Sequence, residues 1–207
     1  MPESSDFDSK IVVQRLLDRL RAGEENAARE LMAVSMDRLR QLSRRILDDI
    51  PGVKRWEDTD DLLQNASVRL WRALANHNPP SPLDYFRLAS AVIRRELIDL
   101  ARHHFGANGF GKNHAPSGLV GGELIGLAEL QPEETNDPEK LGRWTEFHEY
   151  VERLPEEDRS IFDLLWYQGL TLSEASEILT VPERTLRRRW KAARVKVYRD
   201  LLEGLTG

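Results

Sequence analysis

Residues 171–200, near the carboxyl end of this 207-residue chain, read TLSEASEILTVPERTLRRRWKAARVKVYRD and predict two short helices separated by a tight break. Thr171 and Glu174 have the spacing of a capping box, which marks the start of the first helix. The break is expected at residues 180–182, where Pro182 is placed to begin the second helix. Thr180 stands where such turns often have glycine.

The second of these helices has one apolar and one basic face. At about 100° per residue, its large apolar residues and Ala193 share a narrow sector, namely Leu186, Trp190, Ala193 and Val197. Five cations lie roughly opposite: Arg184, Arg187, Arg188, Lys191 and Arg194. A helix that packs through one face and is basic on the other is suited to DNA phosphates and base edges. The pattern therefore indicates a helix-turn-helix, with a surface helix or a partner-binding helix as the alternative.

The charge of the whole chain hides this basic segment. The net charge is −5, which by itself argues against a nucleic-acid partner. However, residues 183–207 carry eight Lys and Arg against three Asp and Glu, and residues 141–182 carry three against nine. Residues 1–104 are balanced, with 17 of each sign. The distribution of charge along the chain indicates more about its partners than the net charge does.

Composition excludes several classes of protein. The chain has no cysteine, so disulfides, iron–sulfur clusters and thiol nucleophiles are excluded. The acidic amino terminus is unlike a signal peptide, and no apolar run approaches the roughly 20 residues of a membrane span. No HExxH, Walker-loop or GxSxG motif occurs either. We therefore expect a cytoplasmic protein that is not an enzyme and needs no metal or cofactor. We expect its histidines to be capping, surface or phosphate-contacting groups: His77, His103, His104, His114 and His148.

The remainder of the chain predicts an all-α protein with two small domains. Apolar residues recur at spacings of three and four throughout, and the expected helices cover about residues 11–20, 28–46, 59–75, 82–104, 144–154 and 155–169. Seven of the 13 glycines fall within residues 105–126, and prolines and acids follow. This composition is typical of a linker. We therefore expect domains at residues 1–104 and 141–207, joined by a flexible linker over residues 105–140.

The expected helix at residues 59–75 has an unusual outer face. Its core side consists of Leu62, Leu63, Ala66, Leu70 and Leu74. The opposite side holds Asp61, Gln64, Asn65, Val68 and Arg72, with Trp71 at the edge. A valine and a tryptophan among polar residues are typical of a protein contact, although isolated apolar residues on a surface are also common.

The next helix carries a second basic stripe. Its apolar side consists of Tyr85, Phe86, Leu88, Ala89, Val92, Leu97 and Leu100, and the other side consists of Arg87, Arg94, Arg95 and Arg102. The preceding loop, residues 76–82, is rich in amides and hydroxyls, which can hold an unstacked base. An ordinary salt-bridged helix is the alternative.

In this order, the segments resemble a bacterial sigma factor of the extracytoplasmic-function (ECF) family. The sequence DTDDLLQNASVRLWR at residues 58–72 resembles the polymerase-binding segment of the family. Residues 85–102 resemble its −10-element segment, and residues 154–199 resemble its −35-element domain. The resemblance implies an alternative sigma factor that directs core RNA polymerase to promoters and assists melting at the −10 element.

The resemblance also assigns roles to individual positions. Contacts with the polymerase clamp helices would come from Asp60, Asp61, Gln64, Asn65, Val68, Trp71 and Arg72. Contacts with the −10 element would come from Asn76, His77, Asn78, Ser81, Arg87, Arg94, Arg95 and Arg102. Contacts with the −35 element would come from Glu183, Arg184, Thr185, Arg187, Arg188, Arg189, Lys191 and Arg194.

Further partners follow from the same resemblance. The polymerase flap, promoter DNA, an anti-sigma factor and a regulatory kinase are expected, with Thr59 a candidate phosphorylation site because phosphate is favourable at a helix amino terminus. A closed free state, with the acidic residues 141–182 against the basic helix, is left open. The competing function is a self-sufficient helix-turn-helix regulator whose amino-terminal helices dimerise or sense a signal. The stripe of arginines within residues 87–102 favours the sigma factor, because a dimerisation domain does not need it.

Overall fold

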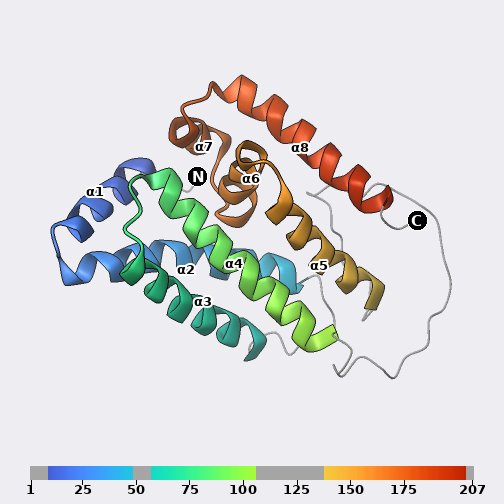
Figure 1. The fold of residues 1–207 in the computed structure, drawn as a ribbon, viewed down its shortest axis with the longest axis horizontal. Coiled ribbons are helices and arrows are strands. Elements are labelled where there is room, and N and C mark those ends of the chain that lie inside the picture. Colours follow the sequence, from blue (N-terminus) through green and yellow to red (C-terminus); the bar gives the residue numbers. More distant parts are fainter. Residues whose placement is uncertain (1–8, 49–56, 106–137, 204–207) are drawn as a thin grey trace, which may run out of the picture.

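The computed structural model describes residues 9–48, 57–105 and 138–203, and its helices confirm the all-α prediction (Figure 1). In chain order they are α1 (Ser9–Arg21), α2 (Glu25–Asp48), α3 (Glu57–Asn76), α4 (Pro82–Phe105), α5 (Pro138–Arg153), α6 (Glu156–Phe162), the π-helical turn η2 (Asp163–Tyr167), α7 (Leu172–Leu179) and α8 (Glu183–Glu203). Across these described ranges, no helix combines the length and the apolar character that a bilayer span requires.

Local signals in the sequence set several helix ends. The backbone N–H of Asp84 donates to Ser81 Oγ (3.2 Å), so Ser81 caps α4, and Pro82 is its first residue. The capping box at Thr171 is confirmed, because its hydroxyl accepts from the Glu174 N–H while the Glu174 carboxylate accepts from the Thr171 N–H. Gly169, with φ of 62°, follows η2 in the left-handed conformation that suits glycine.

Three helices differ from their predicted bounds. Helix α5 begins at Pro138, six residues before the expected start and inside the predicted linker. The second helix of the carboxyl-terminal pair was expected to be short, but α8 has 21 residues. The expected helix at residues 155–169 is divided into α6 and η2, where the Gln168 N–H donates to the Asp163 carbonyl (3.0 Å). That bond spans five residues, one more than in an α-helix, and widens the turn.

Helices α1 to α4 share a core of leucines and aromatic rings. Tyr85 and Phe86 of α4 are fully buried with Leu17 of α1, Leu31 of α2 and Leu70 of α3. The Tyr85 hydroxyl donates to the Leu31 carbonyl and bonds the Ser35 hydroxyl (2.7 Å), so it is satisfied within the core. Helix α4 is thereby held against α2 and α3.

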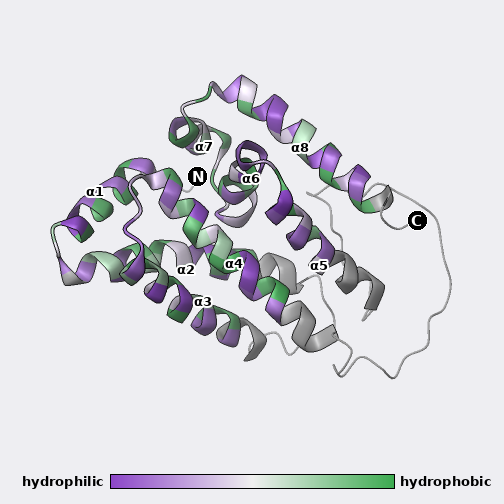
Figure 2. Cartoon of the chain, viewed as in Figure 1, coloured by the Kyte–Doolittle hydropathy of each residue, from purple (hydrophilic) through white to green (hydrophobic). Residues whose placement is uncertain are grey.

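Helices α5 to α8 pack around a second group of aromatic rings. Phe162 of α6 is fully buried and meets Trp190 of α8 edge-on, with 4.8 Å between the ring centroids. Phe147 of α5 contacts the same Phe162 ring at 6.1 Å. Figure 2 shows hydrophilic residues along the length of α8, and its buried positions are Leu186, Ala193 and Val197.

The two halves of the chain lie against one another. Figure 1 shows α4 between α3 and α5, and its far side contacts α5 and η2. Helix α4 is consequently buried on two sides, with Phe86 and Ile93 on its apolar side and Ser90 and Arg94 toward η2. Most of the predicted linker, residues 106–137, lies outside the described residues, and the division into domains stays a prediction.

Candidate nucleic-acid and polymerase interfaces

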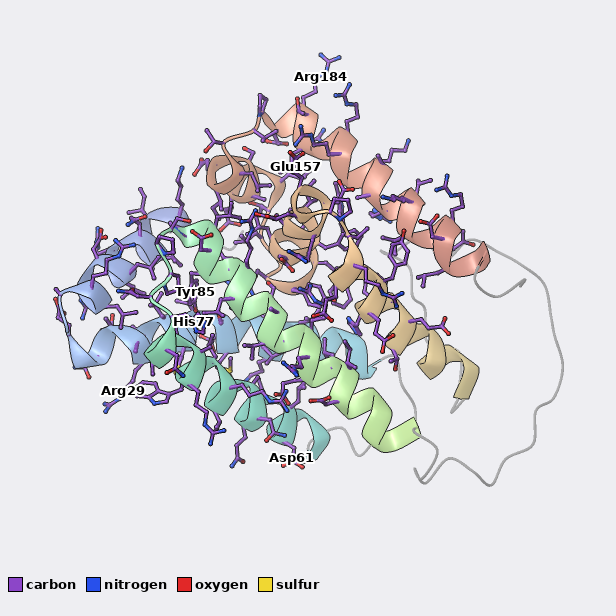
Figure 3. All side chains as sticks on the ribbon, viewed as in Figure 1. Arg29, Asp61, His77, Tyr85, Glu157 and Arg184 are labelled. Atoms are coloured by element: carbon purple, nitrogen blue, oxygen red, sulfur yellow. The ribbon has the colours of Figure 1, made fainter. Side chains whose placement is uncertain are left out.

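The basic face of α8 is open to solvent. Figure 3 shows Arg184 pointing away from the body of the molecule at the start of the helix. In the amino-terminal half of α8, the exposed cations are Arg184, Arg187, Arg188, Arg189 and Lys191. On the opposite side, Leu186, Ala193 and Val197 are buried, as the periodicity predicted. The amino-terminal half of α8 therefore presents a dense positive surface held by an apolar anchor.

Two arginines in the amino-terminal half of α8 pair with acids at exposed positions. Arg187 pairs with Glu183 one turn earlier (2.6 Å), and Arg189 approaches Glu157 of α6 (3.4 Å). Arg194 is half-buried and lies 5.6 Å from the centre of the Trp190 ring. Exposed ion pairs contribute at most about 1 kcal/mol, so phosphate can replace Glu183 or Glu157 at small cost. Thr185 is half-buried, and its N–H donates to the Pro182 carbonyl (2.8 Å).

The turn between α7 and α8 contains a strained residue. Thr180 has φ of 55° and ψ of 41°, and it is the one non-glycine residue with positive φ within residues 9–48, 57–105 and 138–203. The N–H groups of Thr180 and Val181 both donate to the Ser176 carbonyl, which closes the end of α7. Glycine is common at this position of such turns, and the positive φ of Thr180 gives the physical reason, because glycine adopts this conformation without strain.

The outer face of α3 brings together the predicted polymerase contacts. Val68 and Trp71 are large apolar residues that are 44% and 43% exposed. Four polar neighbours on the same face are also exposed: Asp61, Gln64, Asn65 and Arg72. Figure 3 shows Asp61 at the outer edge of the molecule, toward the start of α3. Asp60 and Thr59 belong to α3, but their side chains lie outside the described residues.

The predicted basic stripe on α4 is not an open stripe. Arg95 is exposed, whereas Arg94 is only 3% exposed. The Arg94 guanidinium pairs with the carboxylate of Asp163 in η2 (2.8 Å) and lies 5.0 Å from the centre of the Tyr167 ring. The expectation that Arg94 lies on an open face is therefore wrong for this structure, because η2 covers it.

Arg87 of the same stripe is half-buried against α6. Its guanidinium pairs with Glu156 (2.6 Å) and donates from Nε to the Ser160 hydroxyl (2.9 Å). Arg102 lies within α4, but its side chain is outside the described residues. Whether Arg87, Arg94, Arg95 and Arg102 contact DNA stays a prediction, and for Arg87 and Arg94 it requires the contact with α6 and η2 to open.

The loop before α4 remains accessible at three of its predicted positions. Asn76, His77 and Asn78 are exposed. The amide of Asn76 donates to the Arg72 carbonyl at the end of α3 (2.9 Å). Ser81 is partly buried, and its hydroxyl donates to the Asp84 carboxylate (2.6 Å) while it caps α4. Ser81 thus already has a structural role, whereas His77 and Asn78 can meet a base directly.

Sequence reasoning missed a buried polar cluster between α4, α5 and η2. His148 was expected at a cap or on the surface, which is wrong, because it is 1% exposed and its Nδ1 lies 2.7 Å from the Tyr167 hydroxyl. Burial, with a smaller contribution from the charge of Arg94, lowers the pKa of His148 to about 3. Its place beside Phe147 and one turn before Val151 is helical core spacing, and that signal could have identified it.

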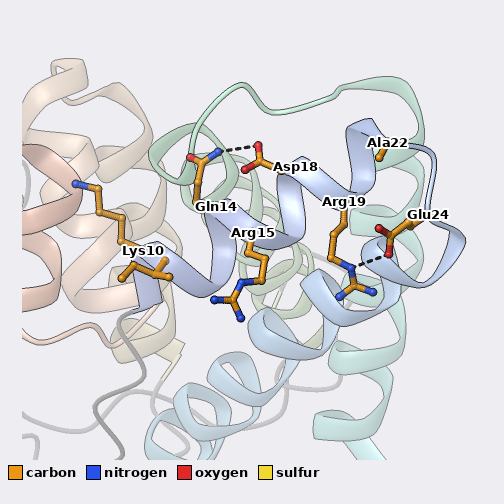
Figure 4. Close-up of a pocket in the computed structure, with 8 residues that line it drawn as sticks. Lys10, Gln14, Arg15, Asp18, Arg19, Ala22 and Glu24 are labelled. Atoms are coloured by element: carbon orange, nitrogen blue, oxygen red, sulfur yellow. Dashed lines mark hydrogen bonds and ion pairs between the residues drawn. The ribbon is translucent and has the colours of Figure 1, made fainter.

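A groove of about 550 Å³ runs along the outer side of α1 (Figure 4). Two interactions join residues of its polar lining: Gln14 donates to Asp18 (3.0 Å), and Arg19 pairs with Glu24 (2.7 Å). None of the residues that the sequence assigned to DNA or polymerase lines this groove. It therefore contributes nothing to the interfaces described above.

Known proteins resemble this chain along nearly its whole length. The family described as "ECF sigma factor" matches residues 11–203. The chain therefore belongs to the ECF sigma factor family, which confirms the resemblance in the sequence. Its role is that of an alternative sigma factor in transcription initiation, which acts with RNA polymerase and binds DNA.

A solved structure entitled "Structure of CnrH in complex with the cytosolic domain of CnrY" is similar to this chain. The identity is 21%, the match covers 95% of this chain and 98% of that chain, and the TM-score is 0.36. No curated protein matches the chain significantly.

Proposed function

We propose that the protein directs core RNA polymerase to a specific set of promoters by using separate surfaces for polymerase and for DNA. The main support is that α3 and α8 each bury one face in the core and expose a chemically different face. The described side chains of the α3 face are apolar groups, amides and charges of both signs, whereas the α8 face is basic. A regulator that binds DNA without polymerase would not need the α3 face.

Helix α8 is proposed to enter the major groove at the −35 element. Its exposed arginines can bind phosphates and read guanine edges with two parallel hydrogen bonds. Leu186 and Ala193 hold the opposite face in the core, so the basic residues approach DNA on a rigid support. Glu183 at the first turn can accept from cytosine amino groups once Arg187 moves to a phosphate.

The outer face of α3 is proposed to bind the clamp helices of the polymerase. Trp71 and Val68 supply the apolar centre of the contact, and Asp61 supplies charge at its rim. Interfaces commonly have this arrangement, in which a buried aromatic anchor carries most of the binding energy. Asn76, His77, Asn78 and Arg95 are proposed to meet the −10 element as the strands separate.

The protein is proposed to act in the cytoplasm, where RNA polymerase binds promoters. An anti-sigma factor, a contact with the polymerase flap and a kinase that acts on Thr59 remain predictions from the family resemblance. None of them is needed for the two-surface arrangement. Melting at the −10 element likewise remains part of the proposal.

Transcription with purified core polymerase on a promoter library tests the proposal. The wild-type chain should produce specific transcripts, and Trp71→Ala should reduce the affinity for core polymerase by about 30-fold, as expected for an interface anchor. Val195→Ala is the matched control, because Val195 is also an exposed large apolar residue, at 59%, but lies on α8. Asp61→Ala should have a smaller effect in the same direction, with exposed Asp37 of α2 as its control.

Two results would contradict the proposal. Normal co-purification of Trp71→Ala with polymerase would remove the α3 face from the interface. Tight, specific binding of a duplex by the free chain, together with no transcript from any promoter, would instead establish the self-sufficient regulator.

A further inference from the structure

Acidic residues of the carboxyl-terminal helices form ion pairs with two arginines that the sequence assigned to the −10 element. The Arg94 guanidinium pairs with Asp163 at 2.8 Å, and the two side chains are only 4% and 2% exposed. About two turns earlier on α4, Arg87 pairs with Glu156 at 2.6 Å. A carboxylate and a phosphate compete for the same guanidinium donors, so neither arginine can bind DNA while these pairs persist.

Neutral hydrogen bonds join the same surfaces around the Arg94 pair. The Ser90 hydroxyl of α4 donates to the Asp163 carbonyl (3.1 Å) and accepts from the Gln168 amide (3.0 Å). The Tyr167 ring lies under the Arg94 guanidinium and connects it to His148. Helix α4 therefore contacts η2 through a connected polar cluster as well as through apolar packing.

A second set of contacts joins α1 and α2 to Gln168 and to α7. Arg38 of α2 donates to the Gln168 carbonyl (2.8 Å) and to the Ser9 hydroxyl (2.8 Å), and Ser9 donates to Glu174. Lys10 donates to the Glu177 carbonyl (2.7 Å). These bonds support the same arrangement of the two halves.

We propose that the pairs Arg94–Asp163 and Arg87–Glu156 form an intramolecular latch that holds the free protein closed and keeps α4 from DNA. This inference rests on the proposed role of α4 at the −10 element. In the closed state, Asp163 and Glu156 take positions on α4 that DNA phosphates would occupy in the open state. The outward faces of α3 and α8 stay exposed, so polymerase can bind before the latch opens.

The physics of buried ion pairs suits such a latch. Burial removes water from both charges, and this cost offsets most of their attraction. On opening, both charges regain water, so the intact pair stabilises the closed state only slightly. Removal of one partner has a much larger effect, because the remaining charge is then buried without compensation. The latch can therefore open when DNA or polymerase offers a small excess of binding energy, and it should be very sensitive to single substitutions.

Fluorescence resonance energy transfer between the two halves of the full chain measures the closed state directly. The natural chain has no cysteine, so Ala75→Cys on α3 and Ala192→Cys on α8 give two exposed labelling sites without competition. Asp163→Asn should lower the ratio of closed to open molecules by about tenfold or more. Asp158→Asn is the matched control, since it removes one acid from the adjacent helix α6 and should leave the transfer efficiency unchanged.

A charge exchange at the more exposed pair separates the latch from a general loss of packing. Glu156 is 63% exposed, so its substitution should not prevent folding. Glu156→Arg should open the latch, and adding Arg87→Glu should close it again. Asp163→Asn and Glu156→Arg should also increase the affinity of the free chain for a −10 single strand by several-fold, whereas the charge-exchanged double variant should not.

The outcomes distinguish this inference from the proposed function. If the two single variants fold, as circular dichroism would show, and keep the wild-type transfer efficiency, the latch is refuted. An active polymerase–promoter complex in which the wild-type chain keeps the closed transfer efficiency would refute it as well. If the variants open but no promoter yields a transcript, the latch stands and the sigma-factor proposal fails.

Discussion

Thr180→Gly should stabilise the protein, because Thr180 occupies a backbone conformation that suits glycine. With φ of 55° and ψ of 41°, it lies in the left-handed helical region. An L-residue there costs about 1–2 kcal/mol, and a β-branched side chain is among the least suited. Glycine avoids this cost but loses about 0.5–1 kcal/mol through the greater freedom of its unfolded chain.

The net gain should be about 0.5–1 kcal/mol. Thr180 is exposed, so little packing is lost, and its N–H can still donate to the Ser176 carbonyl. For a chain of this size, that gain corresponds to a rise in Tm of about 1–4 °C. Thermal and urea unfolding of the full chain, followed by circular dichroism and tryptophan fluorescence, would measure it.

Two further variants test the reason for the gain. Thr180→Asn should give part of it, because asparagine tolerates the left-handed region better than other non-glycine residues. Thr180→Val keeps the branched shape and removes the hydroxyl, so it should give none. The reasoning is refuted if Thr180→Gly is no more stable than the wild type, or if Thr180→Val gains as much.

Two other substitutions test the basic helix and the buried histidine. Arg188→Ala should weaken binding of a −35 duplex and lower the slope of log K against log salt by about 0.9, whereas exposed Arg153→Ala on α5 should not. The pKa of His148 is about 3 in the folded chain and about 6.5 unfolded, so its contribution to stability is full above pH 6.5 and falls as pH falls. At pH 5 the loss should be about 2 kcal/mol. This loss of stability should be absent in His148→Gln. If the wild type and His148→Gln lose the same stability between pH 7 and pH 5, His148 is not the buried group responsible.

The sequence alone was sufficient for the positions of most helices and for which sides of α3 and α8 are buried. Both depend on local information, since an apolar residue recurring every three or four positions shows which side of a helix is buried. Capping residues such as Ser81 and Thr171 satisfy backbone groups within one turn, so they also act locally. The exposed face of α3 and most of the basic face of α8 could therefore be predicted, although Arg194 is half-buried beside the Trp190 ring.

Only the tertiary structure determined what covers α4 and where the remaining polar residues lie. A helical pattern separates apolar from charged sides, but it does not say whether an arginine faces water or a carboxylate. Arg94 meets Asp163, 69 residues further along the chain, because η2 packs against α4. His148 is buried for the same reason, since its partner Tyr167 comes from η2. Interactions within a few residues along the chain thus determined the helices. Ion pairs between residues far apart in the sequence determined that α4 is covered, whereas the outer faces of α3 and α8 are exposed.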